Sequence, residues 1–298
     1  MKPAPFDYYR PESLDAALDL LAKHGPDAKP LAGGQSLVPA MNFRLARPAV
    51  LIDLNRIESL AGIDETAEGG LRIGAMTRQR AVERSPAVAR RAPLLAEAMP
   101  WIAHPQIRNR GTIGGSLAHA DPAAELPAVM LALDARLTVR SRRGSRTIAV
   151  GEFFTGILTT LMAADELLIA VEIPPRPPAA GAAFIEVARR HGDYAMAGVA
   201  AELAMDTRGA CRWCRIALLS VGDTPVLAET AMRAVTGNGP DAKTIEAAGR
   251  AAASALDPPA DLHASSAYRR HLADVLVARA LRLAATRSAA GHGGAPAA

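Results

Sequence analysis

Two short glycine-rich loops constrain this chain more than any other feature. Each contains an adjacent glycine pair, Gly33-Gly34 within Ala-Gly-Gly-Gln-Ser-Leu and Gly114-Gly115 within Gly-Thr-Ile-Gly-Gly-Ser. Because glycine has no side chain, successive backbone N–H groups at such a pair can turn toward one anionic group. A single loop of this kind is typical of an ordinary turn. Two of them predict two grips on a diphosphate, and therefore a dinucleotide cofactor.

The composition is that of a globular chain with a modest charge. Half of the 298 residues are hydrophobic, which is enough for a sizeable core and for two domains, or three. The net charge of +4 comes from arginines interleaved with acidic residues, so we expect no nucleic-acid partner. The N-terminal residues lack the apolar core of a signal peptide, and the uncharged, apolar-leaning run 153–164 is too short to cross a bilayer. We expect a cytoplasmic protein without a transmembrane segment.

The two cysteines lie close together, as Cys211 and Cys214 in Cys-Arg-Trp-Cys. This spacing can indicate a redox pair. A strand is expected from Cys211 to Val221, however, and positions three apart on a strand point to opposite faces. Two buried small side chains are therefore the favoured interpretation. Two cysteines are also too few for an all-cysteine iron–sulfur cluster within this chain.

The first 55 residues predict a small α/β subdomain. A helix capped by Ser13 is expected to continue to His24, where glycine follows and ends it. A strand at 29–32 leads into the first glycine loop, a helix follows at 36–44, and a buried strand is expected at 49–54.

Residues 56–176 predict a second subdomain, which contains the second glycine loop. Asp121-Pro122 is a strong helix start, with Asp121 as the N-cap and proline at the first position of a helix that continues to Leu133. The other expected elements are hairpins at 61–73 and 136–150, a helix from Thr77, a helix over 92–103 and a strand at 166–173.

The proline-rich segment 174–178 is the most linker-like part of the chain. We therefore divide the chain into a first domain, 1–176, and a C-terminal domain, 177–287, with a disordered tail at 288–298. The C-terminal domain is expected to hold a three-stranded sheet followed by helices, which makes the whole chain an α+β protein. Its expected elements are strands at 183–188, 195–205 and 212–221, and helices at 229–235, 241–255 and 267–287.

The common nucleotide and catalytic motifs do not occur. Neither glycine loop has the Gly-x-Gly-x-x-Gly pattern of a Rossmann site or the Gly-x-x-x-x-Gly-Lys-Ser/Thr pattern of an ATP-type phosphate loop. His104 and His119 have no suitably spaced cysteines or carboxylates around them, so no metal site is expected. Nothing resembles a Ser-His-Asp arrangement, which disfavours a hydrolase. A nucleotide would therefore be held on another scaffold, by two loops from two subdomains.

Three motifs together resemble the FAD-binding medium subunits of the molybdenum hydroxylases, the family of xanthine dehydrogenase and carbon monoxide dehydrogenase. They are residues 32–37, residues 106–122 (which contain Gly-Thr-Ile-Gly-Gly-Ser and end in His-Ala-Asp-Pro) and residues 186–195. Ala-Tyr-Arg-Arg at 267–270, before an apolar helix, resembles the end of that subunit. The resemblance covers about residues 1–285 in the correct order. It implies a two-subdomain FAD-binding domain of the p-cresol methylhydroxylase type, followed by a small C-terminal domain of sheet and helices.

The resemblance also implies which residues contact FAD. The two glycine loops would hold the pyrophosphate, Asp121 would lie at the ribose or adenine side, and Asp193 and Tyr194 would lie beside the isoalloxazine ring. The implied contacts are Ala32, Gly33, Gly34, Gln35, Ser36, Leu37, Ala103, Thr112, Gly114, Gly115, Ser116, His119, Asp121, Leu167, Leu168, Asp193 and Tyr194.

Several of these residues have a purely structural alternative. Asp121 also fits an N-cap, Leu167 and Leu168 also fit core packing, and Tyr194 also fits a half-buried strand aromatic. Glu186 stands where many members of the family have lysine, so we expect no cofactor contact there.

The function implied by the resemblance is that of an oxidoreductase subunit. FAD would receive electrons from the 2Fe–2S clusters of a small subunit, which takes them from a large molybdopterin subunit, and would pass them to an external acceptor. The assembly would be a dimer of heterotrimers. No catalytic residue is expected in this chain, because the flavin supplies the redox chemistry. Two other functions stay open: a stand-alone FAD-dependent oxidoreductase, and a non-catalytic flavin-binding interaction protein.

Overall fold

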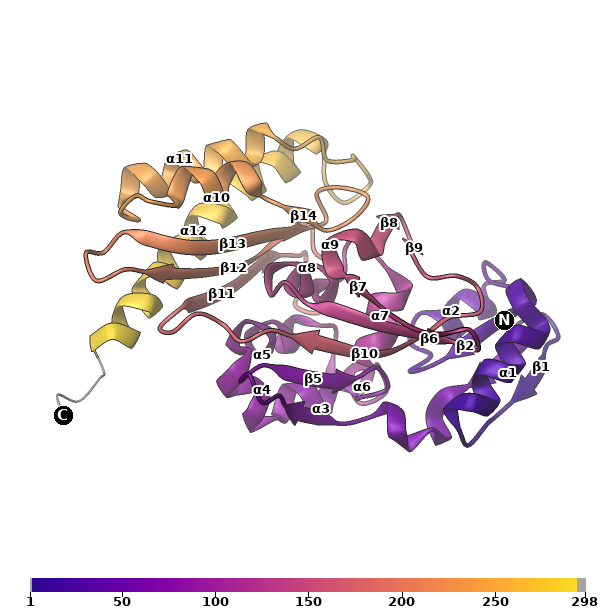
Figure 1. Cartoon of the computed structure of the whole chain (residues 1–298). Helices are drawn as coiled ribbons and strands as arrows, with labels where there is room; N and C mark the ends of the chain where they lie inside the picture. The colour runs from indigo at the N-terminus through magenta and orange to yellow at the C-terminus, as the bar shows by residue number, and fades with distance from the viewer. Residues whose placement is uncertain (1, 294–298) are drawn as a thin grey trace.

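The computed structural model describes residues 2–293 of the chain. Three main sheets are arranged along the molecule, with helices packed between and around them (Figure 1). This mixture of sheets and helices confirms the predicted α+β class. No helix within residues 2–293 is long and apolar enough to cross a membrane.

The N-terminal unit is a three-stranded parallel sheet in the order β1-β3-β2, covered by one helix. As predicted, Ser13 caps that helix, with its hydroxyl accepting a hydrogen bond from the Ala16 N–H at 3.2 Å, and Gly25 ends it at a φ of 53°. The first glycine loop follows β2. The elements are β1 (Asp7–Tyr9), α1 (Leu14–His24), η1 (Gly25–Asp27), β2 (Ala28–Leu31), α2 (Leu37–Asn42) and β3 (Val50–Asp53).

The middle unit is a five-stranded antiparallel sheet in the order β4-β5-β10-β6-β7. Its strands are β4 (Ile63–Glu65), β5 (Leu71–Gly74), β6 (Arg136–Ser141), β7 (Gly144–Ala149) and β10 (Leu167–Ile173), and a separate hairpin is formed by β8 (Phe154–Gly156) and β9 (Thr159–Thr160). Its helices are η2 (Leu54–Arg56), η3 (Glu58–Leu60), α3 (Gln79–Arg84), α4 (Pro86–Arg91), α5 (Pro93–Ala98), η4 (Met99–Trp101), α6 (Pro105–Arg108), α7 (Ile113–His119), α8 (Glu125–Ala132) and α9 (Val150–Phe153).

The C-terminal unit is an antiparallel sheet with helices on one face (Figure 1). The sheet contains the three predicted strands and a short fourth one at its edge. One face packs against α10, α11 and α12, and the other packs against α5 and α8 of the middle unit. The elements are β11 (Gly181–Val187), β12 (Ala197–Met205), β13 (Cys211–Leu219), β14 (Val226–Leu227), α10 (Glu229–Val235), α11 (Ala242–Ser254) and α12 (Ser266–Gly293).

The predicted helix start at Asp121 is wrong. A left-handed residue, Ala120 with φ 55°, ends α7, and the chain then makes a turn before α8 begins at Glu125. Asp121 stabilises that turn instead, because its Oδ1 accepts a hydrogen bond from the Ala123 N–H at 2.9 Å.

The predicted disordered tail is also wrong for residues 288–293, which continue α12. Ser288 is fully buried in this continuation, and its hydroxyl accepts a hydrogen bond from the Met205 N–H of β12 at 3.2 Å. The Arg287 guanidinium forms an ion pair at 2.5 Å with the carboxylate of Glu97, which lies on α5 of the middle unit. The remainder of the predicted tail, 294–298, lies outside the described residues.

The expectation that Cys211 and Cys214 point to opposite faces is wrong as well. The ladder between β12 and β13 shifts register at this place, since Met205 pairs with Cys211 and Ala204 with Trp213. The extra residue, Arg212, forms a β-bulge that changes the alternation of side chains. Both thiols are therefore buried in the same core, against the C-terminal helices. Cys211 donates to the Trp213 carbonyl at 3.4 Å and Cys214 donates to the Met232 carbonyl at 3.7 Å.

Candidate functional site

A single cavity of about 650 Å³ collects every residue that the sequence places at the cofactor. It lies between the N-terminal unit, α7, the start of β10 and the turn before β12. This volume falls in the range of about 300–1,000 Å³ that is usual for ligand sites. The predicted residues in its lining are Ala32, Gly33, Gly34, Gln35, Ser36, Leu37, Ala103, Thr112, Gly114, Gly115, Ser116, His119, Asp121, Leu167, Leu168, Asp193 and Tyr194. Their contact with a cofactor stays a prediction.

The first glycine loop presents free backbone donors. Within residues 2–293, the five N–H groups from Gly33 to Leu37 donate to no other atom of the chain. Gly34 has a φ of 74°, a backbone conformation that residues with a side chain adopt only at a cost in free energy. The turn of this loop therefore favours glycine at position 34. The Gln35 side chain fixes the loop internally, with its Nε2 donating to the Gly33 carbonyl at 3.1 Å.

The backbone N–H groups of the second glycine loop already donate hydrogen bonds to acceptors within the protein. The Ile113 N–H bonds the Thr77 carbonyl at 3.1 Å, and the Gly114 N–H bonds the Ala75 carbonyl at 2.9 Å. Thr112 caps α7, with its Oγ1 accepting from the Gly115 N–H at 3.0 Å. The expectation that both loops offer free backbone donors is therefore wrong for the second loop, because its N–H groups bond protein acceptors at the start of a helix. Its contact with a diphosphate stays a prediction.

Glycine is nevertheless required in the second loop, for close packing. A Cβ at Gly114 would lie 2.5 Å from the Ala75 Cβ and 2.7 Å from the Ala75 carbonyl oxygen. The two loops also touch each other, since a Cβ at Gly33 would lie 2.5 Å from the Arg110 carbonyl oxygen. They form one continuous surface, on which the first loop carries the free donors.

The opposite end of the cavity is built from two turns that pack together. Gly192 has a φ of 89°, and a Cβ there would lie 2.6 Å from the His104 ring, so this turn fits closely against the segment that contains Ala103. The His104 ring thus packs against this turn. Tyr194 lies in an irregular segment before β12 and exposes 66 % of its surface, so it is not the half-buried strand aromatic of the structural alternative.

Comparison with known proteins gives the family. The family described as "FAD binding domain in molybdopterin dehydrogenase" matches residues 4–176, and the one described as "CO dehydrogenase flavoprotein C-terminal domain" matches residues 182–284. The chain belongs to the FAD-binding subunits of the molybdenum hydroxylases.

Members of this family are similar over nearly their whole length. The alpha subunit of the 6-hydroxypseudooxynicotine dehydrogenase complex of Paenarthrobacter nicotinovorans is 45 % identical over 288 residues, which is 97 % of each chain. The carbon monoxide dehydrogenase medium chain of Afipia carboxidovorans is 39 % identical over 97 % of this chain and 99 % of its own. A solved structure of carbon monoxide dehydrogenase from Hydrogenophaga pseudoflava superposes with a TM-score of 0.94 at 40 % identity, covering 96 % of this chain and 99 % of that one.

The observed cavity fits the FAD of this family. A diphosphate needs several hydrogen-bond donors around its oxygens, and the first loop offers five that have no other partner in the described residues. Lys29 also lines the cavity and supplies a cation. Leu167 and Leu168 are buried in the cores and also form part of the cavity wall. Core packing is therefore observed for both, and contact with the cofactor stays a prediction.

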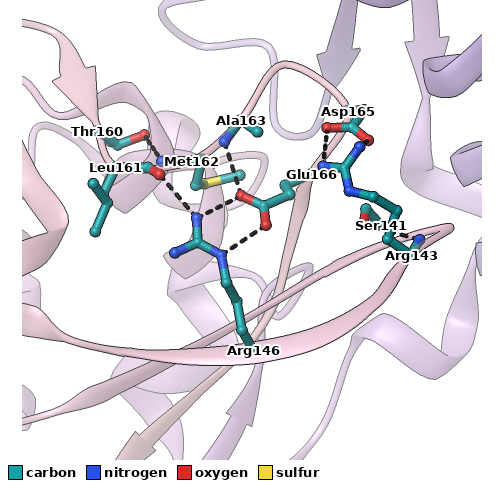
Figure 2. Close-up of polar contacts among 9 residues, drawn as sticks. All are labelled: Ser141, Arg143, Arg146, Thr160, Leu161, Met162, Ala163, Asp165 and Glu166. Carbon is teal, nitrogen blue, oxygen red and sulfur yellow. Dashed lines mark hydrogen bonds and ion pairs between the residues drawn. The ribbon is translucent and has the colours of Figure 1, made fainter.

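One wall of the cavity is fixed by an ion pair (Figure 2). The Arg146 guanidinium bonds both carboxylate oxygens of Glu166 at 2.8 Å and also donates to the Leu161 carbonyl at 2.9 Å. Glu166 accepts a further bond from the Ala163 N–H at 2.8 Å. Arg146 is the main cause of a lowered pKa at Glu166, so the carboxylate stays charged and holds the segment in place.

Two buried glutamates near the cavity were not predicted to matter. Burial raises the pKa of Glu125, which lines the cavity at the start of α8, to about 7, and Asp121 adds a smaller contribution. Burial and then the charge of Glu125 raise the pKa of Glu186 to about 8. Within residues 2–293 neither Glu186 oxygen has a hydrogen-bond partner. Partial burial, followed by Asp121 and Glu125, also raises the pKa of Tyr194.

The sequence contained only a partial signal for this acidic group. Glu186 stood out as a departure from the family pattern. Glu125 gave no signal, because it precedes a run of apolar residues and reads as an ordinary first-turn glutamate. The residues described here also contain no group of three or more His, Cys, Asp or Glu side chains that could hold a metal ion.

Proposed function

We propose that this protein binds FAD with the diphosphate against the first glycine loop and the ring near Asp193 and Tyr194. The observation that carries the proposal is the run of five unpartnered N–H groups in a cavity lined by all the predicted contact residues. The second loop shapes the cavity beside them and offers the Ser116 hydroxyl. The chain's own work is to hold, orient and shield the cofactor.

The bound FAD supplies exchange of one or two electrons. We infer that these electrons come from a small subunit with 2Fe–2S clusters, which receives them from a large molybdopterin subunit, in a dimer of heterotrimers. The relatives support the coarser part of this proposal, because they are named as the alpha subunit of a dehydrogenase complex and as the medium chain of carbon monoxide dehydrogenase. The chain is thus one subunit of a multi-subunit oxidoreductase.

We also infer that the chain divides at the proline-rich segment 174–178. The two family matches support this, since one ends at residue 176 and the other begins at 182. The cytoplasmic location expected from the sequence stays a prediction.

The test of the proposed function has two steps. The cofactor of the purified chain is released by heat and identified against FAD and FMN standards; we expect FAD, and FMN would contradict the diphosphate grip. The chain is then assayed for substrate oxidation, alone and after assembly with its two partner subunits. We expect flavin reduction by substrate only in the assembly. Comparable turnover by the chain alone would favour a stand-alone oxidoreductase.

A further inference from the structure

A chain of polar side chains connects the two glycine loops from behind. It begins at Asp53, the last residue of β3, which accepts hydrogen bonds from the Tyr8 hydroxyl at 2.5 Å and the Asn55 N–H at 2.9 Å. It continues through Asn55 to Arg78, which stands just before α3. None of these four residues lines the cavity within the described part of the chain.

Asn55 reaches the first loop. Its Nδ2 donates to the Ala32 carbonyl, one residue before Gly33, at 3.0 Å. Its Oδ1 accepts from Nη2 of Arg78 at 2.5 Å, and its own orientation is fixed by Asp53. The amide therefore uses its donor for the first loop and its acceptor for Arg78.

Arg78 reaches the second loop. Its Nη1 donates to the carbonyl of Arg110, one residue before Gly111. That carbonyl belongs to the backbone against which Gly33 packs. One end of the guanidinium thus bonds the second loop directly, and the other end connects to the first loop through Asn55.

The charge of Arg78 has an unusual setting. The guanidinium is half-buried, and within residues 2–293 it forms no ion pair with a carboxylate. Both of its acceptors are neutral carbonyl oxygens. Burial and then the neighbouring Arg110 lower the pKa of Arg78. An arrangement that leaves a cation unpaired behind two loops is suited to an anionic ligand in front of them.

We propose that Asn55 and Arg78 are positioning residues that set the spacing of the two glycine loops and so determine the affinity for a diphosphate-containing flavin. This inference rests on the proposed function. A planar guanidinium can bond two acceptors in fixed directions, which a lysine ammonium cannot reproduce. The two residues act as one unit, because removal of either breaks the connection between the two loops.

The experiment is a double-mutant cycle on FAD affinity. Asn55→Ala, Arg78→Met and the double variant are titrated with FAD as apo-proteins, and thermal unfolding of each apo-protein is recorded in parallel. Each single variant is expected to weaken FAD binding by about tenfold to fiftyfold, and the double variant by no more than the larger single effect. Arg78→Lys should show most of the loss seen with Arg78→Met. Arg72→Met, which removes an exposed arginine of β5, is the matched control and should leave FAD affinity unchanged.

Three results would overturn the inference. Multiplied losses in the double variant would mean that the two residues act separately. Full recovery with Arg78→Lys would mean that the charge alone acts, directly on the ligand. Unchanged FAD affinity with lowered apo-protein stability would leave Asn55 and Arg78 a purely structural role. Wild-type protein that binds no FAD would instead contradict the proposed function itself.

Discussion

The two glycine loops look alike in sequence but do different work in the structure. The first loop lines the cavity and leaves the N–H groups of Gly33 to Leu37 without partners in the described residues. The N–H groups of the second loop donate to acceptors on Ala75, Thr77 and Thr112, because this loop starts the helix α7. The first loop needs glycine for its backbone turn, at Gly34, and the second needs it for contact with a neighbouring strand end, at Gly114. Similar motifs can thus be required for different physical reasons.

The charges follow the same division. Lys29 lies on the side of the first loop, whereas Asp121 and Glu125 follow the second loop. Free donors and a cation together favour an anion at the first loop. We therefore assign the diphosphate mainly to the first loop, and the shaping of the cavity to the second.

The largest expected effect comes from Gly114→Ala. The added Cβ would overlap the Ala75 backbone, which belongs to a buried strand end and cannot move freely. We expect a loss of about 3 kcal/mol in the free energy of unfolding. Chemical denaturation of the apo-protein measures it. A variant as stable as the wild type would show that the second loop is not packed as described.

Gly34→Ala should separate binding from folding. The residue has a φ of 74°, so a side chain there costs about 1–2 kcal/mol, and the nearest atoms, on Val38 and Leu31, are 3.2 and 3.3 Å from the added Cβ. We expect a folded protein whose FAD affinity falls by about tenfold or more, because the free N–H groups lose their common direction. Flavin fluorescence titration measures this affinity. Equal FAD affinity in Gly34→Ala and the wild type would contradict the assignment of the diphosphate to the first loop.

A smaller, pH-dependent effect is expected on the acidic side of the cavity. The pKa of Glu186 is about 8 in the folded chain, above its value in the unfolded chain, so the folded state binds this proton more tightly. The contribution of Glu186 to the free energy of unfolding is therefore fully present at low pH and is lost as the pH rises toward and through about 8. Glu186→Gln removes the charge that must be buried, and should be more stable than the wild type by about 1–2 kcal/mol at pH 9, with little difference at pH 5.

The matched control for that experiment is Glu246→Gln, an exposed glutamate of α11. It should leave the pH dependence of the unfolding free energy unchanged. If Glu186→Gln behaves in the same way, the buried acidic pair does not govern the pH response. Another ionisable group would then cause the pH dependence of the unfolding free energy.

Much of the fold follows from local rules that the sequence displays. The Ser13 cap, the Gly25 stop and the alternating strands after the proline-rich segment predicted elements that the structure contains. The errors come from contacts that a local pattern does not show. Asp121-Pro122 has the chemistry of a helix start, but the left-handed Ala120 places a turn there. Residues 288–293 are mostly alanine and glycine and were expected to be disordered, but α12 continues through them and Ser288 is buried against β12.

The sequence predicted which residues line the cavity, but not which hydrogen-bond donors are free or how the two loops are connected. The motifs identified the cavity lining, because the family resemblance marks residues that face one ligand. They did not show which N–H groups are free, since that depends on partners such as Ala75 and Thr77 from other segments. They also missed the connection through Asn55 and Arg78, which are ordinary polar residues outside every motif. The bulge at Arg212, which lets both thiols lie in the same core, has no local signal either.

Amide hydrogen exchange with and without FAD tests the central claim most directly. In the apo-protein, the N–H groups of residues 113–116 are hydrogen-bonded and should exchange slowly, whereas those of residues 33–37 should exchange fast. Addition of FAD should slow exchange in the first loop and change the second loop little. Slowed exchange confined to residues 113–116, with the first loop unaffected, would contradict the assignment of the diphosphate to the first loop.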